Sequence, residues 1–333
     1  MCIRDSLKGA YSVVLMISGV GLLAIRDPNG IRPLMMGKKE NDLLGKTDYM
    51  FASESPALDA LDFEILGDLK PAEAVFVSLE GKMSRKICHN SPQHSPCIFE
   101  YVYLARPDAV IEEISVLKSR LRMGQKLGKK INSAYPNSKI DAVIPIPESS
   151  TSSAIEVAKY LGVNYREGFV KNRYIGRTFI MPKQDMRRKS VRRKLNPIPF
   201  EFKDKNILLI DDSIVRGTTS KEIVEMARDA GAKKVFFASA APPIRFQNVY
   251  GIDMAATTEL IAHQKDEGQI AEYIGADWLV YQNLEDLIRS AKVGNKEIEN
   301  FETSIFDGEY LDDQVSSDYL KNLEVLRSDS NKI

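Results

Sequence analysis

The chain has 333 residues, of which 44% are apolar and 28% charged, and its 46 basic residues balance 46 acidic ones. This length allows two domains with real cores, and the neutral balance argues against a general nucleic-acid-binding protein, which would carry a basic excess. No apolar run approaches the length of a membrane span and no signal peptide is recognisable, so we expect a cytoplasmic protein without a membrane partner. The three cysteines have no metal-ligand spacing, which argues against a disulfide framework or a zinc site.

The first part of the chain is predicted to be rich in strands. Strand-like runs cover 10–17, 22–25, 74–79 and 82–87, and Glu80-Gly81 between the last two suggests a hairpin. A helix is expected to begin at Ser53 or Ser55. The polar, proline-rich segment 89–97 then suggests a domain boundary.

Beyond that boundary, helices and apolar strands alternate. Helices are predicted over 114–134, 154–161 and 220–230, and strands over 142–146, 207–210 and 234–240. This order predicts an α/β, doubly wound, mostly parallel sheet, in which ligands bind at the carboxyl ends of the strands. The tail beyond Ser290 is polar and acidic, with a helix expected around 318–326.

The stretch 207–220 carries the strongest chemical signal. An apolar strand ends in two carboxylates, Asp211 and Asp212, and a helix start follows at Gly217-Thr218-Thr219-Ser220. A helix N-terminus favours a phosphate, whereas the carboxylates can bind ribose hydroxyls and Mg²⁺. A sugar phosphate with a second, metal-bound phosphate group would satisfy both features. The alternative is a strand that ends in an aspartate capping the next helix.

This stretch is the phosphoribosyl-pyrophosphate (PRPP) signature of type I phosphoribosyltransferases, and further motifs narrow the resemblance. From about Leu7 to the tail, the chain resembles the amidophosphoribosyltransferase family. Members of that family are pentosyltransferases that transfer ammonia from glutamine to C1 of PRPP, the first committed step of purine biosynthesis. The motifs are "VIPIPESS" (143–150), "GFVKNRYIGRTFIMP" (168–182), "RRKSVRRKL" (187–195), "IDDSIVRGTTS" (210–220), "NVYGIDM" (248–254) and "TELIAH" (258–263).

The resemblance assigns roles to individual residues. Asp211 and Asp212 are expected to be catalytic and, with Ser149, to hold Mg²⁺. An ammonia channel would be lined by Tyr103, Tyr174, Phe179, Ile180 and Leu260, although apolar residues of this kind are more often simply core. PRPP would be bound by Ser149, Ser150, Lys171, Arg173, Arg177, Ser213, Val215, Arg216, Gly217, Thr218, Thr219 and Ser220.

The basic segment 171–194 resembles the family's mobile loop, which folds over PRPP. The family also implies a homo-oligomer and feedback inhibition by purine nucleotides. His263 follows an apolar run and is expected to be structural, since ammonia needs no obvious general base.

The front of the chain resembles only the back part of the family's N-terminal-nucleophile glutaminase domain. We expect residues 1–6 to be a foreign leader, 7–98 a partial glutaminase domain, 99–290 the phosphoribosyltransferase domain and 291–333 a helical tail. Cys2 is not expected to be the glutaminase nucleophile, because sequence from much later in that domain follows it at once. Half a domain would leave apolar strand faces uncovered, which predicts aggregation or local disorder.

One branch of the family carries an iron–sulfur cluster on four cysteines. Here Cys97 stands at one such position, while Asn248, Ser304 and Asp307 stand where the others would be expected. One cysteine cannot hold a cluster, so we expect none. Three alternatives to an ammonia-dependent enzyme remain open: a PRPP enzyme with a nucleobase acceptor, a non-catalytic PRPP-sensing module, and an inactive fragment.

Overall fold

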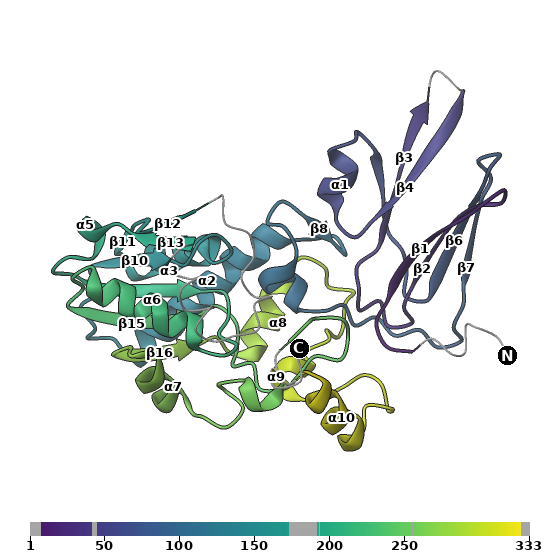
Figure 1. Ribbon diagram of the computed structural model, residues 1–333. Coiled ribbons are helices and arrows are strands. Elements are labelled where there is room, and N and C mark those ends of the chain that lie inside the picture. Colours follow the sequence, from purple (N-terminus) through teal and green to yellow (C-terminus); the bar gives the residue numbers. More distant parts are fainter. Residues whose placement is uncertain (1–7, 42–44, 173–191, 193, 255, 328–333) are drawn as a thin grey trace.

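The structure is a computed structural model that describes residues 8–41, 45–172, 192, 194–254 and 256–327. Figure 1 shows a larger lobe of alternating helices and strands and a smaller lobe of antiparallel strands, with the chain between them passing through residues 88–115.

The larger lobe is built on a five-stranded parallel sheet, as the sequence predicts. Strand β14 (Asn206–Asp211) lies at its centre, and five of the six residues in that strand are buried. Such continuous burial explains why the strand reads as an unbroken apolar run. The strand order is β11 (Asn164–Tyr165), β10 (Ala142–Pro145), β14, β15 (Lys234–Ser239) and β16 (Trp278–Tyr281).

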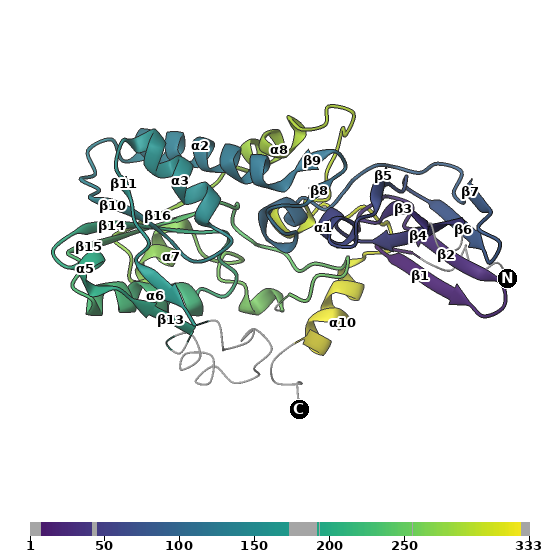
Figure 2. The ribbon, with the colours of Figure 1, turned by 90° about the horizontal axis from the view of Figure 1, so that it is seen from above.

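Helices cover both faces of this sheet (Figure 2). Leu208 and Ile210 point into one core cluster with α2 (Val116–Ala134) and α3 (Thr151–Leu161). Ile207 and Leu209 point into another with α6 (Thr218–Asp229) and α7 (Glu267–Ile274). The two-residue alternation of a strand thus supplies both faces, and the doubly wound architecture is confirmed.

The smaller lobe holds two antiparallel sheets. One has the order β1 (Ser12–Ile17), β2 (Gly21–Arg26), β6 (Glu73–Ser78) and β7 (Met83–Ile87), and the β6–β7 hairpin is confirmed. The other, with the order β4 (Lys46–Ala52), β3 (Met35–Asn41), β5 (Glu64–Asp68), was not predicted, because polar residues interrupt the apolar alternation of β3 and β4. The short helix α1 (Ser55–Asp59) begins at one of the two predicted serines.

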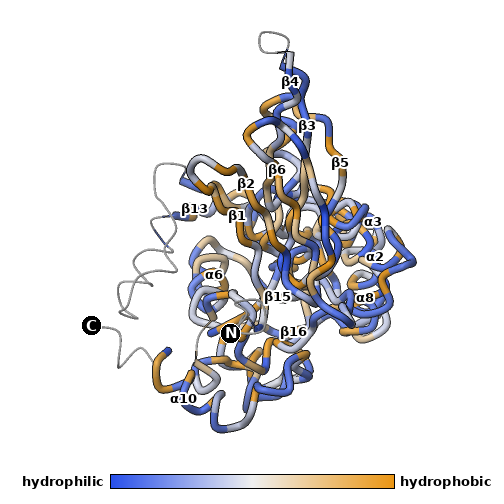
Figure 3. Tube along the Cα trace, turned by 90° about the vertical axis from the view of Figure 1, so that its right-hand side faces the viewer, coloured by the Kyte–Doolittle hydropathy of each residue, from blue (hydrophilic) through white to orange (hydrophobic). Residues whose placement is uncertain are grey.

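The edge strands of the first sheet expose apolar side chains. Val14 and Leu15 of β1 are 47% and 46% exposed, and Met16 is 87% exposed. Figure 3 shows the corresponding hydrophobic stretches along β1 and β2. The predicted uncovered face is therefore present, whereas aggregation stays a prediction.

Buried ionic contacts join the two lobes. A guanidinium nitrogen of Arg26 lies 2.5 Å from Glu112, and His94 Nε2 lies 3.1 Å from the other oxygen of the same carboxylate. The Glu112 backbone N–H donates to Asp68 over 2.9 Å. Burial, and then repulsion by Glu112, raises the pKa of Asp68 to about 7. The segment 89–97 is therefore anchored through His94, and the predicted domain boundary stays a prediction.

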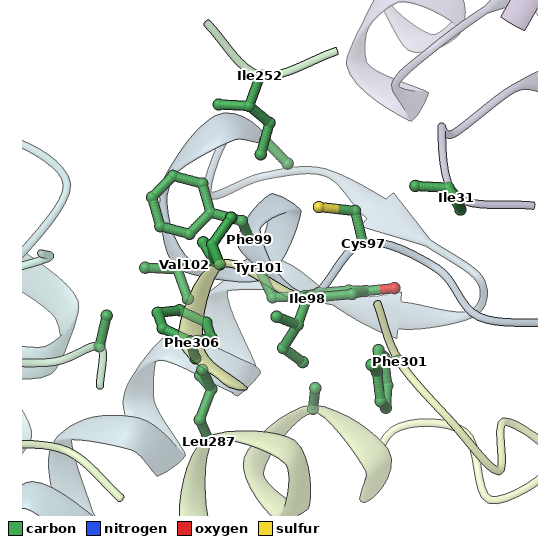
Figure 4. Close-up of a cluster of buried hydrophobic side chains, with 14 of the residues drawn as sticks. Ile31, Cys97, Ile98, Phe99, Tyr101, Val102, Ile252, Leu287, Phe301 and Phe306 are labelled. Carbon is green, nitrogen blue, oxygen red and sulfur yellow. The ribbon is translucent and has the colours of Figure 1, made fainter. Parts of the chain in front are cut away.

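An apolar core also forms behind this junction. It gathers side chains of the connecting helix η2 (Glu100–Leu104) and of the C-terminal segment, including Tyr101, Phe301 and Phe306 (Figure 4). The predicted terminal helix is confirmed as α10 (Ser317–Arg327). The remaining elements are β8 (Val110–Ile111), β9 (Ile114–Ser115), β12 (Phe169–Lys171), β13 (Leu195–Pro197), α5 (Pro199–Phe202), η3 (Thr257–Glu259), α8 (Leu284–Lys292) and α9 (Ser304–Asp307).

Candidate functional site

The acidic pair lies at the carboxyl edge of the parallel sheet. Asp211 is the last residue of β14, and Asp212 follows it directly. Both side chains are buried, and an oxygen of Asp211 accepts the backbone N–H of Asp212 over 2.9 Å. This is the position at which parallel sheets bind ligands.

The neighbouring strand brings the serine-containing loop against this pair. Strand β10 runs parallel to β14, with Pro145 opposite Ile210, so the loop 146–150 leaves the sheet beside the aspartates. The Ser149 hydroxyl donates to one oxygen of Asp212, and the Ser213 hydroxyl donates to the other over 2.7 Å. Ser150 instead donates to the carbonyl of Ile146, and its side chain does not cap α3.

Two buried carboxylates so close together disfavour ionisation. Burial, and then repulsion by Asp212, raises the pKa of Asp211 well above its usual range. Burial also raises the pKa of Asp212, although the hydrogen bonds from Ser149 and Ser213 and the charge of Arg120 lower it. A cation or a hydroxyl-rich ligand would relieve this repulsion.

The N-terminus of α6 offers a site for an anion. Its N-cap residue is Gly217, no side chain caps the helix, and N–H groups of a first turn have no partner inside a helix. The alternative in which an aspartate caps this helix is therefore wrong. Thr218 and Thr219 are half-buried here, and Ser220 is buried.

Gly217 is required at this turn for two reasons. Its φ of +74° lies in the left-handed region, and an added Cβ would lie 2.5 Å from Cδ1 of Ile261. The Ile261 backbone N–H donates to the carbonyl of Val215 over 2.9 Å, which holds the two segments together. The motif 258–263 thus supports the loop 213–217, which leads into α6.

Two predicted cationic PRPP contacts pair with carboxylates. The guanidinium of Arg216 forms an ion pair with Glu259. The predicted contact between Arg216 and PRPP would therefore be made by the backbone of Arg216. Lys171 is exposed and lies 3.5 Å from Glu148 of the serine loop. Arg173, Arg177 and most of the segment 171–194 lie outside the described residues, although its Arg192 contacts Glu222 of α6 over 3.2 Å.

The predicted channel residues are described only in part. Leu260 is buried in the same apolar cluster against which Tyr103 packs, which agrees equally with a core role. Tyr174, Phe179 and Ile180 lie outside the described residues, so the channel stays a prediction. His263 Nδ1 lies 2.8 Å from the carbonyl oxygen of Arg245, a contact that fits the structural role expected for it.

The four positions considered for an iron–sulfur cluster hold residues with other partners. Burial, and then repulsion by Glu302, raises the pKa of the Cys97 thiol well above its usual value. Ser304 donates to Glu302, and Thr303 donates to Asp307. Asn248 accepts two backbone N–H groups, from residues 250 and 252, at 2.8 and 2.9 Å.

Sequence reasoning missed two residues near the acidic pair. Arg120 is buried in α2 and attracts Asp212 electrostatically, and Ser153 of α3 donates to the Arg120 carbonyl over 3.0 Å. An arginine on the apolar face of a predicted helix was the available signal, because a buried cation needs compensating partners.

Comparison with known proteins agrees with this geometry. The phosphoribosyl transferase domain family matches residues 111–249. Amidophosphoribosyltransferase of Escherichia coli strain K12 is 56% identical over 326 residues, which cover 98% of this chain and 64% of that protein. The chain thus spans less than two thirds of the length of this curated relative. In the described ranges, no helix is long and apolar enough to cross a membrane.

Two solved structures are also similar. The glutamine PRPP amidotransferase of B. subtilis, in complex with ADP and GMP, is 36% identical with a TM-score of 0.79, and the match covers 93% of this chain and 66% of that one. A structure described as the allosteric regulatory enzyme of purine biosynthesis is 34% identical with a TM-score of 0.82, over 97% of this chain and 67% of that one. The chain belongs to the amidophosphoribosyltransferase family.

Proposed function

We propose that this protein transfers ammonia to C1 of PRPP, giving 5-phosphoribosylamine and pyrophosphate. The observation that carries the proposal is the hydrogen bond from Ser149 to Asp212, which joins the serine loop to the acidic pair across 63 residues. That contact brings a candidate pyrophosphate loop and a candidate ribose site together at one edge of the sheet. Family membership supports the same reaction.

Each part of the site has a distinct task in this reaction. The N-terminus of α6, at Gly217–Ser220, would bind the 5′-phosphate through backbone N–H groups. Asp211 and Asp212 would accept hydrogen bonds from the ribose hydroxyls and stabilise the positive charge that develops at C1. Ammonia attacks C1 as the bond to the pyrophosphate oxygen breaks, with inversion, and the surplus proton of the new amine passes to solvent. Ser149 and Ser150 would lie next to the leaving group.

The donor set suits Mg²⁺. The oxygens of Asp211, Asp212 and Ser149 are hard ligands, and Mg²⁺ commonly binds one or two carboxylates together with substrate phosphates and water. In the described ranges, no group of three or more His, Cys, Asp or Glu residues could hold a metal without such help. Bound there, Mg²⁺ would neutralise the charge of the departing pyrophosphate.

The wider family assignments belong to the same proposal. They comprise the glutaminase-like front (7–98), the transferase part (99–290), the helical tail (291–333), the ammonia channel and a homo-oligomer in the cytoplasm. A nucleotide carries a ribose 5′-phosphate, so the N-terminus of α6 could also bind purine nucleotides as feedback inhibitors. The relative solved with ADP and GMP supports this part.

The test is pyrophosphate release from PRPP and Mg²⁺, measured in parallel with ammonium chloride and with glutamine. We expect release with ammonium that Asp211→Asn abolishes, while Asp313→Asn, the same change at an exposed aspartate before α10, serves as the matched surface control. Release with glutamine would contradict the rejection of Cys2 as nucleophile. Soluble protein that binds PRPP but releases nothing would refute the enzyme and favour a sensing module. Release that required a nucleobase in place of ammonium would indicate a different transferase.

A further inference from the structure

Arg120 is a buried cation that the proposed reaction does not use. It lies in α2 and is only 3% exposed. Its Nε donates to the carbonyl of Tyr101 over 3.0 Å, and a terminal nitrogen donates to the carbonyl of Ala105 over 2.8 Å. Both carbonyls belong to the segment around η2, the helix that carries Tyr103. One guanidinium therefore fixes this segment against α2.

The backbone of Arg120 is bonded to the first turn of α3, the helix that follows the serine loop. The Ser153 hydroxyl donates to the Arg120 carbonyl over 3.0 Å. The helices touch closely here, because a Cβ added at Gly124 would lie 2.3 Å from the carbonyl oxygen of Ser153. Ser153 lies in the first turn of α3, directly after the loop from which Ser149 donates to Asp212. A short chain of contacts thus runs from η2 through Arg120 to the acidic pair.

The charge of Arg120 acts on the same pair. No carboxylate of the described residues forms an ion pair with Arg120. Burial lowers the pKa of Arg120, and attraction by two acidic groups, Asp212 first, opposes that shift. A buried cation without a direct counter-ion is costly, and a nearby anion offsets part of that cost. Arg120 therefore attracts Asp212 while it holds η2.

We infer that Arg120 is a positioning residue, which holds the acidic pair and the η2 segment in one fixed arrangement. The inference rests on the proposed function and deepens it. In that reaction, Arg120 aligns the acidic pair, which would lie beneath the ribose, with η2, past which ammonia would arrive. Misplacement by about 1 Å at a reacting centre can cost on the order of 10²-fold in rate.

The geometry explains why arginine stands here. Its planar fork reaches two carbonyls at once, whereas a lysine would keep the charge but make only point contacts. Arg120→Lys therefore preserves the attraction for Asp212 and loses part of the hold on η2. Arg120→Met keeps similar bulk and loses both.

The matched control is Arg122, two residues along the same helix. It is half-buried and donates to the carbonyl of Ser290 over 3.2 Å, so Arg122→Met also removes a cation that binds a backbone carbonyl. Its contact leads to α8 and away from the serine loop.

The experiment measures kcat and KM for PRPP with ammonium chloride in the full chain. For Arg120→Met we expect kcat to fall about 10²-fold. We expect KM to change by less than about 3-fold, because the substitution does not touch the N-terminus of α6, where the phosphate would bind. We expect Arg120→Lys to recover at least about 10-fold of that loss, and Arg122→Met to match the wild type. A double-mutant cycle with Ser149→Ala should be non-additive, because both changes act on Asp212.

Separate outcomes distinguish the inference from the proposed function. A wild-type chain that releases no pyrophosphate refutes the proposed function and, with it, this inference. If the wild type is active, three results would overturn the inference and leave the proposed function standing. These are full kcat in Arg120→Met, a loss of kcat in Arg122→Met as large as that in Arg120→Met, or an additive cycle with Ser149→Ala. If Arg120→Met fails to fold, Arg120→Lys takes its place, alone and in the double-mutant cycle with Ser149→Ala. Full kcat in Arg120→Lys together with an additive cycle would then overturn the inference.

Discussion

Replacing Gly217 by alanine tests whether the loop 213–217, the proposed phosphate site before α6, is held in place by the segment that contacts it. Alanine at a φ of +74° costs ~1–2 kcal/mol. The new Cβ would also lie 2.5 Å from Cδ1 of Ile261, and overpacking of this kind costs ~1–3 kcal/mol. Cδ1 is the tip of the buried Ile261 side chain, so the clash is relieved only if that side chain repacks among its buried neighbours. We expect Gly217→Ala to lower the free energy of unfolding by ~2–5 kcal/mol.

Urea unfolding of four variants separates the two contributions. Gly162 has a φ of +67° and nothing within 4 Å of its added Cβ, so Gly162→Ala should cost only the backbone part, ~1–2 kcal/mol. Ile261→Val removes the clashing Cδ1 at a cost of ~0.5–1.5 kcal/mol. Combined with Gly217→Ala, it should recover ~1 kcal/mol relative to the sum of the single changes.

The same variants report on function. A displaced loop should raise KM for PRPP about 10-fold or more in Gly217→Ala and leave Gly162→Ala unchanged. Equal stability losses in these two variants, or strict additivity with Ile261→Val, would refute the steric argument.

Three further predictions concern other contacts. Gly124→Ala should lower the thermal unfolding temperature through a loss of ~1–3 kcal/mol, because its Cβ would meet the backbone carbonyl of Ser153. An unchanged temperature would contradict the close helix contact. Asp68 binds its proton more tightly in the folded state, with a pKa of about 7. Its contribution to the free energy of unfolding is therefore complete below pH ~4 and is lost as the pH rises to ~7. Urea unfolding between pH 5 and 7 should show that fall in the wild type and a flatter pH profile in Asp68→Asn. Ser149→Ala should lower kcat/KM for PRPP about 10–100-fold, the equivalent of one hydrogen bond to a charged group of ~1.5–3 kcal/mol, and a kinetic assay that finds no loss would remove the serine loop from the site.

The front sheets show where sequence reasoning stopped. The strands β1, β2 and β6 could be predicted because apolar or β-branched runs mark them, and β7 because the Glu80-Gly81 turn follows β6. The three-stranded sheet around β3 was missed, since polar residues interrupt the apolar alternation of β3 and β4.

The acidic pair and the helix start that follows it were fixed locally. A continuous apolar run, two aspartates and a Gly-Thr-Thr turn specify the end of a buried strand and the start of a helix, since each feature depends on near neighbours in the chain. Only the structure showed that no aspartate caps this helix. This motif therefore predicted a PRPP site at the carboxyl edge of the sheet, whereas the resemblance to the family needed the further motifs as well.

Only the tertiary structure decided which partners surround that motif. Ser149 reaches Asp212 across 63 residues because β10 and β14 are parallel neighbours, and the charge of Arg120 attracts the same carboxylate from α2, which packs beside α3 on one face of the sheet. No local pattern encodes such pairings: they follow from strand order and helix packing, which depend on the burial of the whole core. The sequence by itself determined the chemical groups of the site, and long-range packing decided which of them act together.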